Sequence, residues 1–325
     1  MVEYTLPIVF IVGGLIAVVW GANEFVKGAA ATALNFGLSP LIVGLTVVGL
    51  GTSAPEMIVA IMASTQGKAQ IALGNALGSN ITNIALILGL VALIKPINVE
   101  SRIVSRELPL LIIISLSAMA LLLDGRLARL DGILLTAGLF IVMTWLVQQV
   151  ESEDSDGLEE KIISELPDET SKGKAIFLLL FGMAVLLGGS HILVDGAVDI
   201  AQMLGVSDLV IGLTIIAIGT SLPELAAALA ATYKGLHDLT IGNVIGSNVF
   251  NLLTVMSIPG LIAPGPVPGD VISRDVPILI TLTLAFFAFA FKVGNRQGRI
   301  NRAEGFALFS AFIGYQLFLY FSTAA

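Results

Sequence analysis

Two glutamates stand inside long apolar stretches of this 325-residue chain, and each ends the same short frame. Glu56 closes Gly-Thr-Ser-Ala-Pro-Glu, and Glu224 closes Gly-Thr-Ser-Leu-Pro-Glu. A carboxylate in the middle of an apolar span is costly and usually serves a function. A single one could merely hold helices together, but a matched pair favours function. The proline before each glutamate removes a backbone amide, so we expect a kinked or opened helix with free carbonyls around 49–52 and 217–220.

Further oxygen donors stand at helical spacing around both glutamates. The hydroxyl residues three and four positions before each glutamate share its helical face; they are Thr52, Ser53, Thr220 and Ser221. The next apolar run in each half carries polar residues at intervals of four, which form a stripe along one side of a helix. From these stripes we expect four ligands, Ser79, Asn83, Ser247 and Asn251, and four supporting residues, Asn75, Asn80, Asn243 and Asn248.

The chemistry of these donors indicates a hard cation. The donors are all oxygen atoms, and the chain has no cysteine and only two histidines, which favours Ca²⁺, Mg²⁺ or Na⁺ over zinc or copper. Two carboxylates would neutralise Ca²⁺, whereas Mg²⁺ prefers to keep its waters. Several Na⁺ ions could use the same oxygens in place of one Ca²⁺, and this competition is a direct route to antiport. Proton coupling is chemically open as well, because buried carboxylates can take up protons.

The composition requires a lipid surrounding. Charged residues make up 12% of the chain and the mean hydropathy is +0.96, whereas a soluble domain has about twice that share of charge. A helix needs about 20 apolar residues to cross a bilayer. We therefore predict an all-α polytopic membrane protein with ten transmembrane helices, at 5–26, 40–65, 70–94, 107–123, 127–149, 174–198, 207–232, 238–262, 271–292 and 303–321.

The lysines and arginines predict the orientation. Twelve of the sixteen fall in the odd-numbered loops between these runs and four in the others, so the positive-inside rule places the odd-numbered loops in the cytoplasm. We expect a multi-pass protein of the cell (inner) membrane with both termini extracytoplasmic. The acidic segment 150–173 is then a cytoplasmic linker.

The chain is built from two copies of one unit. GLTVVGLGTSAPE at 44–56 matches GLTIIAIGTSLPE at 212–224, and the same offset of 168 residues relates GNALGSNITN at 74–83 to GNVIGSNVFN at 242–251. Each copy has five spans, and an odd number forces the second copy to enter the membrane upside down. We predict two inverted five-helix repeats, residues 1–149 and 174–325, with the ion site at their interface near the middle of the membrane.

The paired motifs resemble the two alpha repeats of the sodium/calcium exchanger family, within the cation/calcium antiporter superfamily. The hallmark regions cover 39–90 and 207–258, and ten spans with an acidic central loop extend the likeness over the chain. The resemblance implies alternating access, in which a bundle containing the first and sixth spans slides against a core of spans two, three, seven and eight.

The resemblance also implies roles for individual residues. Glu56 and Glu224 would bind Ca²⁺ and be shared with Na⁺, while Thr52 and Thr220 would contribute carbonyls and hydroxyls. Na⁺ would be bound by four hydroxyls, those of Ser53, Ser221, Ser79 and Ser247. The residue three before each threonine would offer a carbonyl to Na⁺, and these residues are Gly49 and Ala217.

Coupling to Na⁺ is favoured over the alternatives. Some relatives carry an acid where Asn251 stands, and in the potassium-dependent branch that acid is associated with potassium transport; calcium/proton exchangers carry a glutamate in the segment matching 79–83, which has none here. We therefore expect an antiporter that exchanges Ca²⁺ for Na⁺, with a Ca²⁺/H⁺ or Na⁺-Ca²⁺/H⁺ antiporter as the alternative and a cation channel as a more distant one. An enzyme is disfavoured because no nucleophile or phosphate-binding loop accompanies the carboxylates. We expect no cofactor, nucleic acid or protein partner.

Overall fold

The computed structural model describes residues 5–150, 170–204, 217–291 and 298–324, which are mostly helical. Helices suit these apolar runs because a backbone surrounded by lipid must satisfy its hydrogen bonds internally. The helical elements of the first half, in which η marks π-helix, are α1 (Thr5–Phe36), α2 (Pro40–Val43), η2 (Gly44–Val48), α3 (Gly49–Thr52), α4 (Ala54–Thr65), α5 (Ala69–Ile81), η3 (Thr82–Leu88), α6 (Gly89–Ile94), α7 (Ser101–Ser105), α8 (Glu107–Ala120) and α9 (Arg129–Val150).

The second half repeats this order, with four short strands placed between the helices of both halves. Its helical elements are α11 (Lys172–Met203), α13 (Ala217–Thr220), α14 (Leu222–Tyr233), α15 (His237–Phe250), η5 (Asn251–Val255), α16 (Ser257–Ile262), η6 (Val271–Asp275), α17 (Val276–Ala290) and α18 (Arg302–Ala324). The strands are β1 (Ile97–Val99), β2 (Arg126–Leu127), β3 (Gly265–Pro266) and β4 (Gly298–Ile300).

The spans agree closely with the ten apolar runs of the sequence. Among the described residues, eight helices are long and apolar enough to cross a membrane, and a ninth span is the pair Leu41–Thr52 and Ala54–Thr65, which is bent by 42°. The remaining run, 207–232, begins outside the described residues, and α13 and α14 form the rest of it.

The first span is longer than predicted. We expected it to end at residue 26 and Lys27 to lie in a loop, but α1 continues to Phe36. Inside the helix, Lys27 Nζ lies 2.6 Å from Glu24 Oε1, one turn away. This pair lets two charged side chains stay within a helix whose flanking residues are apolar.

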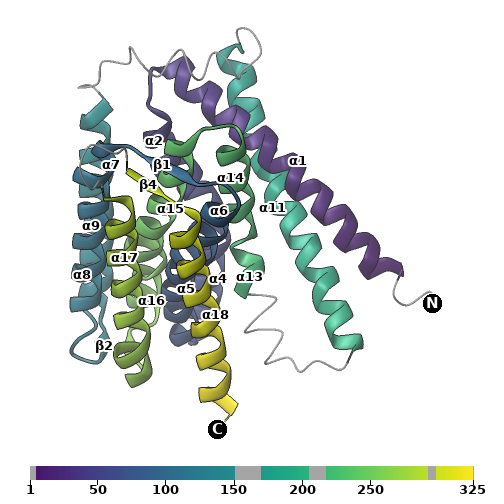
Figure 1. Cartoon of the computed structure of the whole chain (residues 1–325). Helices are drawn as coiled ribbons and strands as arrows, with labels where there is room; N and C mark the ends of the chain where they lie inside the picture. Colours follow the sequence, from purple (N-terminus) through teal and green to yellow (C-terminus); the bar gives the residue numbers. More distant parts are fainter. Residues whose placement is uncertain (1–4, 151–169, 205–216, 292–297, 325) are drawn as a thin grey trace.

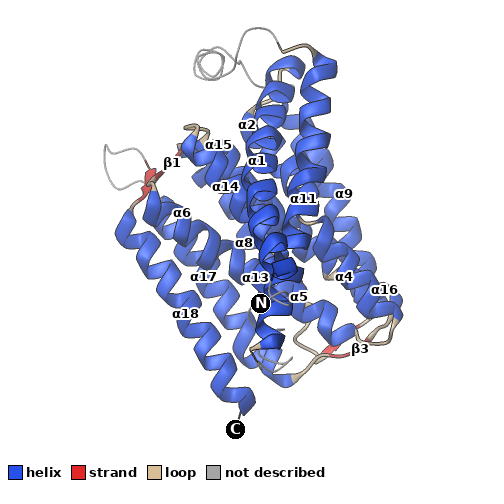
Figure 2. Ribbon diagram, turned by 90° about the vertical axis from the view of Figure 1, so that its right-hand side faces the viewer, coloured by secondary structure: helices blue, strands red, loops and turns tan. Residues whose placement is uncertain are grey.

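Two small β-ribbons show that the halves are inverted. β1 pairs with β4 in antiparallel fashion, with Ile97 opposite Ile300, and β2 pairs with β3, with Arg126 opposite Pro266. β1 and β3 are equivalent strands, because 97 and 265 are 168 residues apart. They lie at opposite ends of the molecule (Figures 1 and 2). Equivalent parts of the two halves therefore face opposite sides of the membrane, as the odd number of spans requires.

The two longest helices form a closely packed antiparallel pair, inclined to the other spans (Figure 1). Glycines recur every seven residues along both, and the two sets are related by the repeat: Gly14, Gly21 and Gly28 on α1, and Gly182, Gly189 and Gly196 on α11. A Cβ atom at Gly21 would lie 2.6 Å from the backbone nitrogen of Leu186, and one at Gly189 would lie 2.9 Å from that of Val18. The absence of side chains at these positions lets the two backbones meet.

The described apolar residues bury themselves in two clusters. The larger one is formed chiefly by α5, α8, α15 and α17. The smaller one is centred on the α1–α11 pair, around Phe25, Val26 and Leu186, and touches α14 through Ala227 and Ala231. The α1–α11 pair thus packs through this smaller cluster against α14, beside the larger core.

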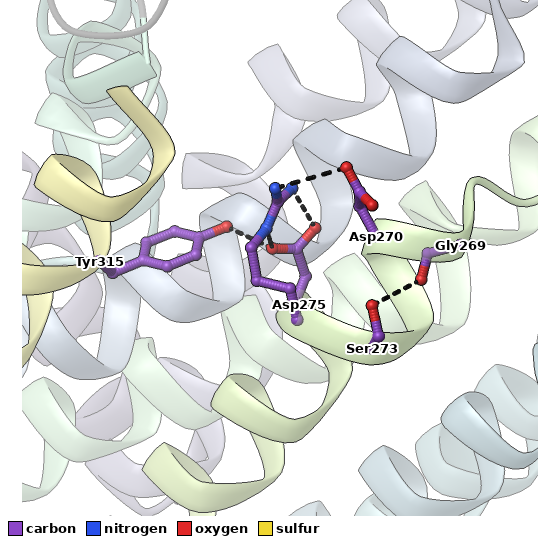
Figure 3. Close-up of polar contacts among 6 residues, drawn as sticks. Gly269, Asp270, Ser273, Asp275 and Tyr315 are labelled. Carbon is purple, nitrogen blue, oxygen red and sulfur yellow. Dashed lines mark hydrogen bonds and ion pairs between the residues drawn. The ribbon is translucent and has the colours of Figure 1, made fainter. Parts of the chain in front are cut away.

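A polar cluster anchors the last span to the ninth (Figure 3). Arg274 Nε donates to Asp275 Oδ1 at 2.8 Å, and the hydroxyl of Tyr315 on α18 donates to the same oxygen at 3.0 Å. The equivalent acid of the first half is Glu107, whose Oε1 lies 3.5 Å from Arg102 Nε. Both acids stand where a span begins, and both are buried and paired with arginine.

Candidate ion-binding site

Each glutamate of the repeated frame begins the second part of a broken helix. α3 ends at Thr52, Ser53 leaves the helical conformation (φ −81°, ψ 4°), and α4 starts with Glu56 in its first turn. The second half repeats this break at Ser221 (φ −94°, ψ 4°), with Glu224 in the first turn of α14. The predicted kink is present at both prolines. A carboxylate in a first turn lies at the positive end of the helix dipole, which partly offsets the cost of its burial.

The free carbonyls expected around each break are partly used by the protein itself. The carbonyl of Gly49, an expected Na⁺ ligand, accepts the Ser53 amide at 3.1 Å. Pro223 cannot donate an amide to Gly219, and the hydroxyl of Ser190 on α11 donates to that carbonyl instead, at 3.1 Å. The expectation that the break would free all of these carbonyls was therefore wrong at Gly49, whose carbonyl keeps a backbone donor, and at Gly219, where a neighbouring helix supplies the missing donor.

The two carboxylates of the repeated frame are buried. Glu56 is 1% exposed and Glu224 is 2% exposed. None of their four oxygens has a hydrogen bond of good geometry to any described residue, and the same holds for the hydroxyls of Ser53 and Ser221. The hydroxyl of Ser79 lies beside Glu56, that of Thr52 lies beside Glu224, and the carboxylates are close enough to interact electrostatically. Two unpaired buried carboxylates facing hydroxyls fit a bound cation, which would offset their desolvation and repulsion.

The two repeats meet at these residues. The hydroxyl of Thr52 donates to Asn243 Oδ1 at 3.2 Å and lies 3.3 Å from the hydroxyl of Ser247. Asn83 Nδ2 lies 3.4 Å from Asn248 Oδ1. Residues that are far apart in the chain, on α3, η3 and α15, thus lie close together.

Matched hydrogen bonds hold the backbone of both glutamates. Asn75 Nδ2 donates to the carbonyl of Glu56, and Asn243 Nδ2 donates to the carbonyl of Glu224, both at 3.2 Å. The two bonds are related by the repeat. Asn75 and Asn243 therefore position the glutamates, a more specific role than the general support expected from sequence.

The remaining expected ligands lie on the helices that meet at the site or on the segments that continue these helices. Ser79, Asn83, Ser247 and Asn251 are all buried, and neither amide atom of Asn251 has a hydrogen-bond partner among the described residues. Asn83 and Asn251 lie in the π-helical segments η3 and η5, a local widening that is frequent at functional sites. Thr220 ends α13 and is half-buried, and Ala217 begins that helix. Throughout the described ranges there is no group of three or more His, Cys, Asp or Glu arranged to hold a metal ion, so the site combines two carboxylates with neutral oxygens.

Sequence reasoning missed two features of the structure. Ser190 was not singled out, because its partner is a carbonyl freed by a distant proline. The relation between Glu107 and Asp275 was also missed, although both follow Ser-Arg and precede x-Pro at the same offset of 168. Continuing the repeat comparison past residue 258 would have related these two acids.

A comparison with known proteins decides the family. The family model described as sodium/calcium exchanger protein matches this chain twice, at residues 6–148 and at 174–321. The chain belongs to the sodium/calcium exchanger family. Each match covers one half of the chain, as expected of a duplicated unit.

Several known proteins resemble the chain over nearly its whole length. CaxA of Alkalimonas amylolytica is 46% identical over 315 residues, covering 97% of this chain and 98% of the relative. The inner membrane protein YrbG of Escherichia coli is 39% identical, with 97% of each chain covered. A solved structure of the sodium–calcium exchanger NCX_Mj, soaked with Na⁺ and Sr²⁺, superposes with a TM-score of 0.82 at 31% identity and covers 95% of this chain and 96% of the other.

These similarities confirm the predicted fold class and the broad class of function. The chain is an all-α, multi-pass membrane protein with two inverted repeats, and it is a cation antiporter of the calcium-exchanging family rather than an enzyme. Whether Ca²⁺ is exchanged for Na⁺ or for H⁺ depends on the chemistry of the site.

Proposed function

We propose that this protein exchanges Ca²⁺ for Na⁺ by presenting one set of buried oxygens alternately to the two sides of the membrane. The observation that carries the proposal is the pair Glu56 and Glu224, two repeat-related carboxylates that are buried and unpaired among the described residues. Two carboxylates balance the charge of one Ca²⁺. The surrounding hydroxyl and amide oxygens supply further ligands of the kind that Ca²⁺ and Na⁺ accept.

The same oxygens serve both ions in this proposal. The two carboxylates bind Ca²⁺ together with the Thr52 and Thr220 oxygens. Na⁺ uses the carboxylates in turn with hydroxyl, amide and carbonyl oxygens from both repeats; these are contributed by Ser53, Ser79, Asn83, Ser221, Ser247, Asn251, Gly49 and Ala217. Because the ions share ligands, bound Na⁺ displaces Ca²⁺, and this competition couples their movements. Asn251 is neutral, so the site has no third carboxylate for an additional cation.

The α1–α11 pair provides an element that can move as a body. Its glycine-lined contact, where the two backbones meet, supports motion of both helices together. Residues of the larger core, including those on α5 and α15, would hold the ions while the pair shifts across the breaks at Ser53 and Ser221. Such a shift opens the site to one side and closes it to the other.

The chain organisation and the orientation belong to the same proposal. Residues 1–149 form the first repeat, 150–173 a cytoplasmic linker, and 174–325 the second repeat. The excess of lysine and arginine in the odd-numbered loops supports extracytoplasmic termini, and the similarity to YrbG supports an inner-membrane location.

Uptake of radiolabelled Ca²⁺ into everted membrane vesicles, under one imposed ion gradient at a time, tests the coupling. Vesicles loaded with Na⁺ should take up Ca²⁺ when diluted into Na⁺-free medium, and vesicles loaded with K⁺ should not. Monensin, which dissipates a Na⁺ gradient, should abolish the uptake. Vesicles from cells lacking the protein provide the background.

The other outcomes identify the alternatives. Uptake driven by a pH gradient alone, and indifferent to Na⁺, would overturn Na⁺ coupling in favour of Ca²⁺/H⁺ exchange. Uptake that proceeds at full rate without any opposing cation would overturn antiport and indicate a channel.

A further inference from the structure

A cavity of about 540 Å³ lies beside the breaks that hold the ion site. One wall is formed by α11, from Ser190 to Asp199, and Phe10 of α1 contributes to the rim. The cavity also reaches Pro55, Thr220 and Pro223, the residues flanking the two buried glutamates in sequence. It therefore extends along α11 as far as the helix breaks at the site.

Three polar side chains of α11 line this cavity at intervals of one helical turn. His191, Asp195 and Asp199 are spaced by four and share one face of the helix. His191 Nε2 lies 3.5 Å from Asp195 Oδ2, and the Asp195 side chain is 52% exposed. The described residues lining the cavity include no lysine or arginine. Carboxylates within a transmembrane helix face water rather than lipid, so this face indicates a wet, negatively charged passage.

The first repeat does not carry acids at the positions equivalent to Asp195 and Asp199. Residue Asp195 corresponds to Lys27 of α1, and Asp199 corresponds to Ala31, in the register that matches Gly196 with Gly28. Lys27 is paired with Glu24 at 2.6 Å. α1 and α11 run in opposite directions (Figure 1). Gly28 packs against Leu179 near the start of α11, and Gly196 packs against Pro7 near the start of α1, so Lys27 and Asp195, which precede these glycines, lie toward opposite ends of the helix pair. Asp195 near one side of the membrane is thus the equivalent of a lysine, Lys27, near the other side.

We propose that Asp195 and Asp199 recruit cations into this cavity and raise the apparent affinity for Ca²⁺ on that side of the membrane only. The inference rests on the proposed function, since it concerns how the exchanged ions reach the site. Clefts lined by one sign of charge concentrate counter-ions and speed their association, and salt weakens the effect. The carboxylates act before the ion is bound at the site, so they affect the apparent KM and leave the maximal rate unchanged.

The test is the double variant Asp195→Asn, Asp199→Asn, assayed in right-side-out and in everted vesicles. At low ionic strength we expect its apparent KM for Ca²⁺ to rise on the order of threefold to tenfold on one side and to stay unchanged on the other. Choline chloride at high ionic strength should shrink the difference from wild type. By the proposed orientation, the affected side is the extracytoplasmic one.

Asp270→Asn is the matched control, because Asp270 is 80% exposed and does not line the cavity. It makes the same kind of substitution, with the loss of one negative charge outside the cavity, and should leave KM unchanged on both sides. An unchanged KM in the double variant, an equal rise on both sides, or a rise insensitive to salt would overturn the inference. Failure of the proposed function looks different, because the wild-type protein would then take up no Ca²⁺ against Na⁺ in either vesicle type, and the inference would fall with it.

Discussion

The hydroxyl of Thr52 lies 3.3 Å from the hydroxyl of Ser247, which brings together one residue from each repeat at the centre of the protein. The same Thr52 hydroxyl donates to Asn243, which in turn holds the carbonyl of Glu224. The break in the first half and the glutamate of the second half are thus linked through one short chain of hydrogen bonds. A single binding site built from both repeats follows naturally from this link.

Asn243 should matter more for Ca²⁺ affinity than its repeat counterpart Asn75. Asn75 makes one hydrogen bond, to Glu56, whereas Asn243 bonds both Glu224 and Thr52. With about 1 kcal/mol for each bond, we expect Asn75→Ala to raise the apparent KM for Ca²⁺ about fivefold and Asn243→Ala roughly 25-fold. Initial rates of Na⁺-driven uptake at a series of Ca²⁺ concentrations measure both. Equal effects would contradict the linked arrangement.

The contact between α1 and α11 should be intolerant of a single added methyl group. In Gly21→Ala, the new Cβ would meet the Leu186 backbone at 2.6 Å and force the helices apart. We expect the free energy of unfolding to fall by roughly 1–3 kcal/mol and the unfolding temperature in detergent to fall with it. Gly13→Ala is the matched control on the same helix, because a Cβ there has no described neighbour within 4 Å. Equal unfolding temperatures for the two variants would contradict the close packing.

Exchange by the wild-type protein should not require K⁺, because Asn251 is neutral. Neither amide atom of this side chain is bonded to a described residue, and the side chain is fully buried. Asn251→Asp would add a third carboxylate, so we expect K⁺ to stimulate uptake in the variant, where it could balance the added charge. The measurement is Na⁺-driven Ca²⁺ uptake with and without K⁺ in the wild type and in Asn251→Asp. A wild-type protein that is inactive without K⁺ would show that neutral oxygens suffice for a K⁺ site.

The features that could be predicted from sequence are those set by local chemistry and repetition. Pro55 and Pro223 predicted both breaks because proline removes an amide wherever it stands in a helix. The repeat at an offset of 168 residues, with five spans in each copy, predicted the inversion. The structure shows it, because the equivalent strands β1 and β3 lie at opposite ends of the molecule. Burial of Glu56 and Glu224 followed from their position inside apolar runs.

The features that could not be predicted depend on which helices meet. Spacing puts Ser247 on a face of α15 but does not say that Thr52 of the other repeat lies opposite it. Ser190 replaces the donor that Pro223 lacks, and only the packing of α11 against α13 shows this. The length of α1 was underestimated because Glu24 and Lys27 look like a helix end in isolation, whereas their pairing keeps them inside the helix.

The shared site built on the two glutamates is tested most directly by Na⁺-driven Ca²⁺ uptake in Glu56→Gln and Glu224→Gln, with Glu100→Gln as the control. Glu100 is exposed and outside the site, so its variant should exchange like the wild type. Both site variants should lose exchange while unfolding at the same or a higher temperature, because each removes an unpaired buried charge and keeps the shape of the side chain. Near wild-type uptake by either folded site variant would contradict the account, since one carboxylate would then be dispensable.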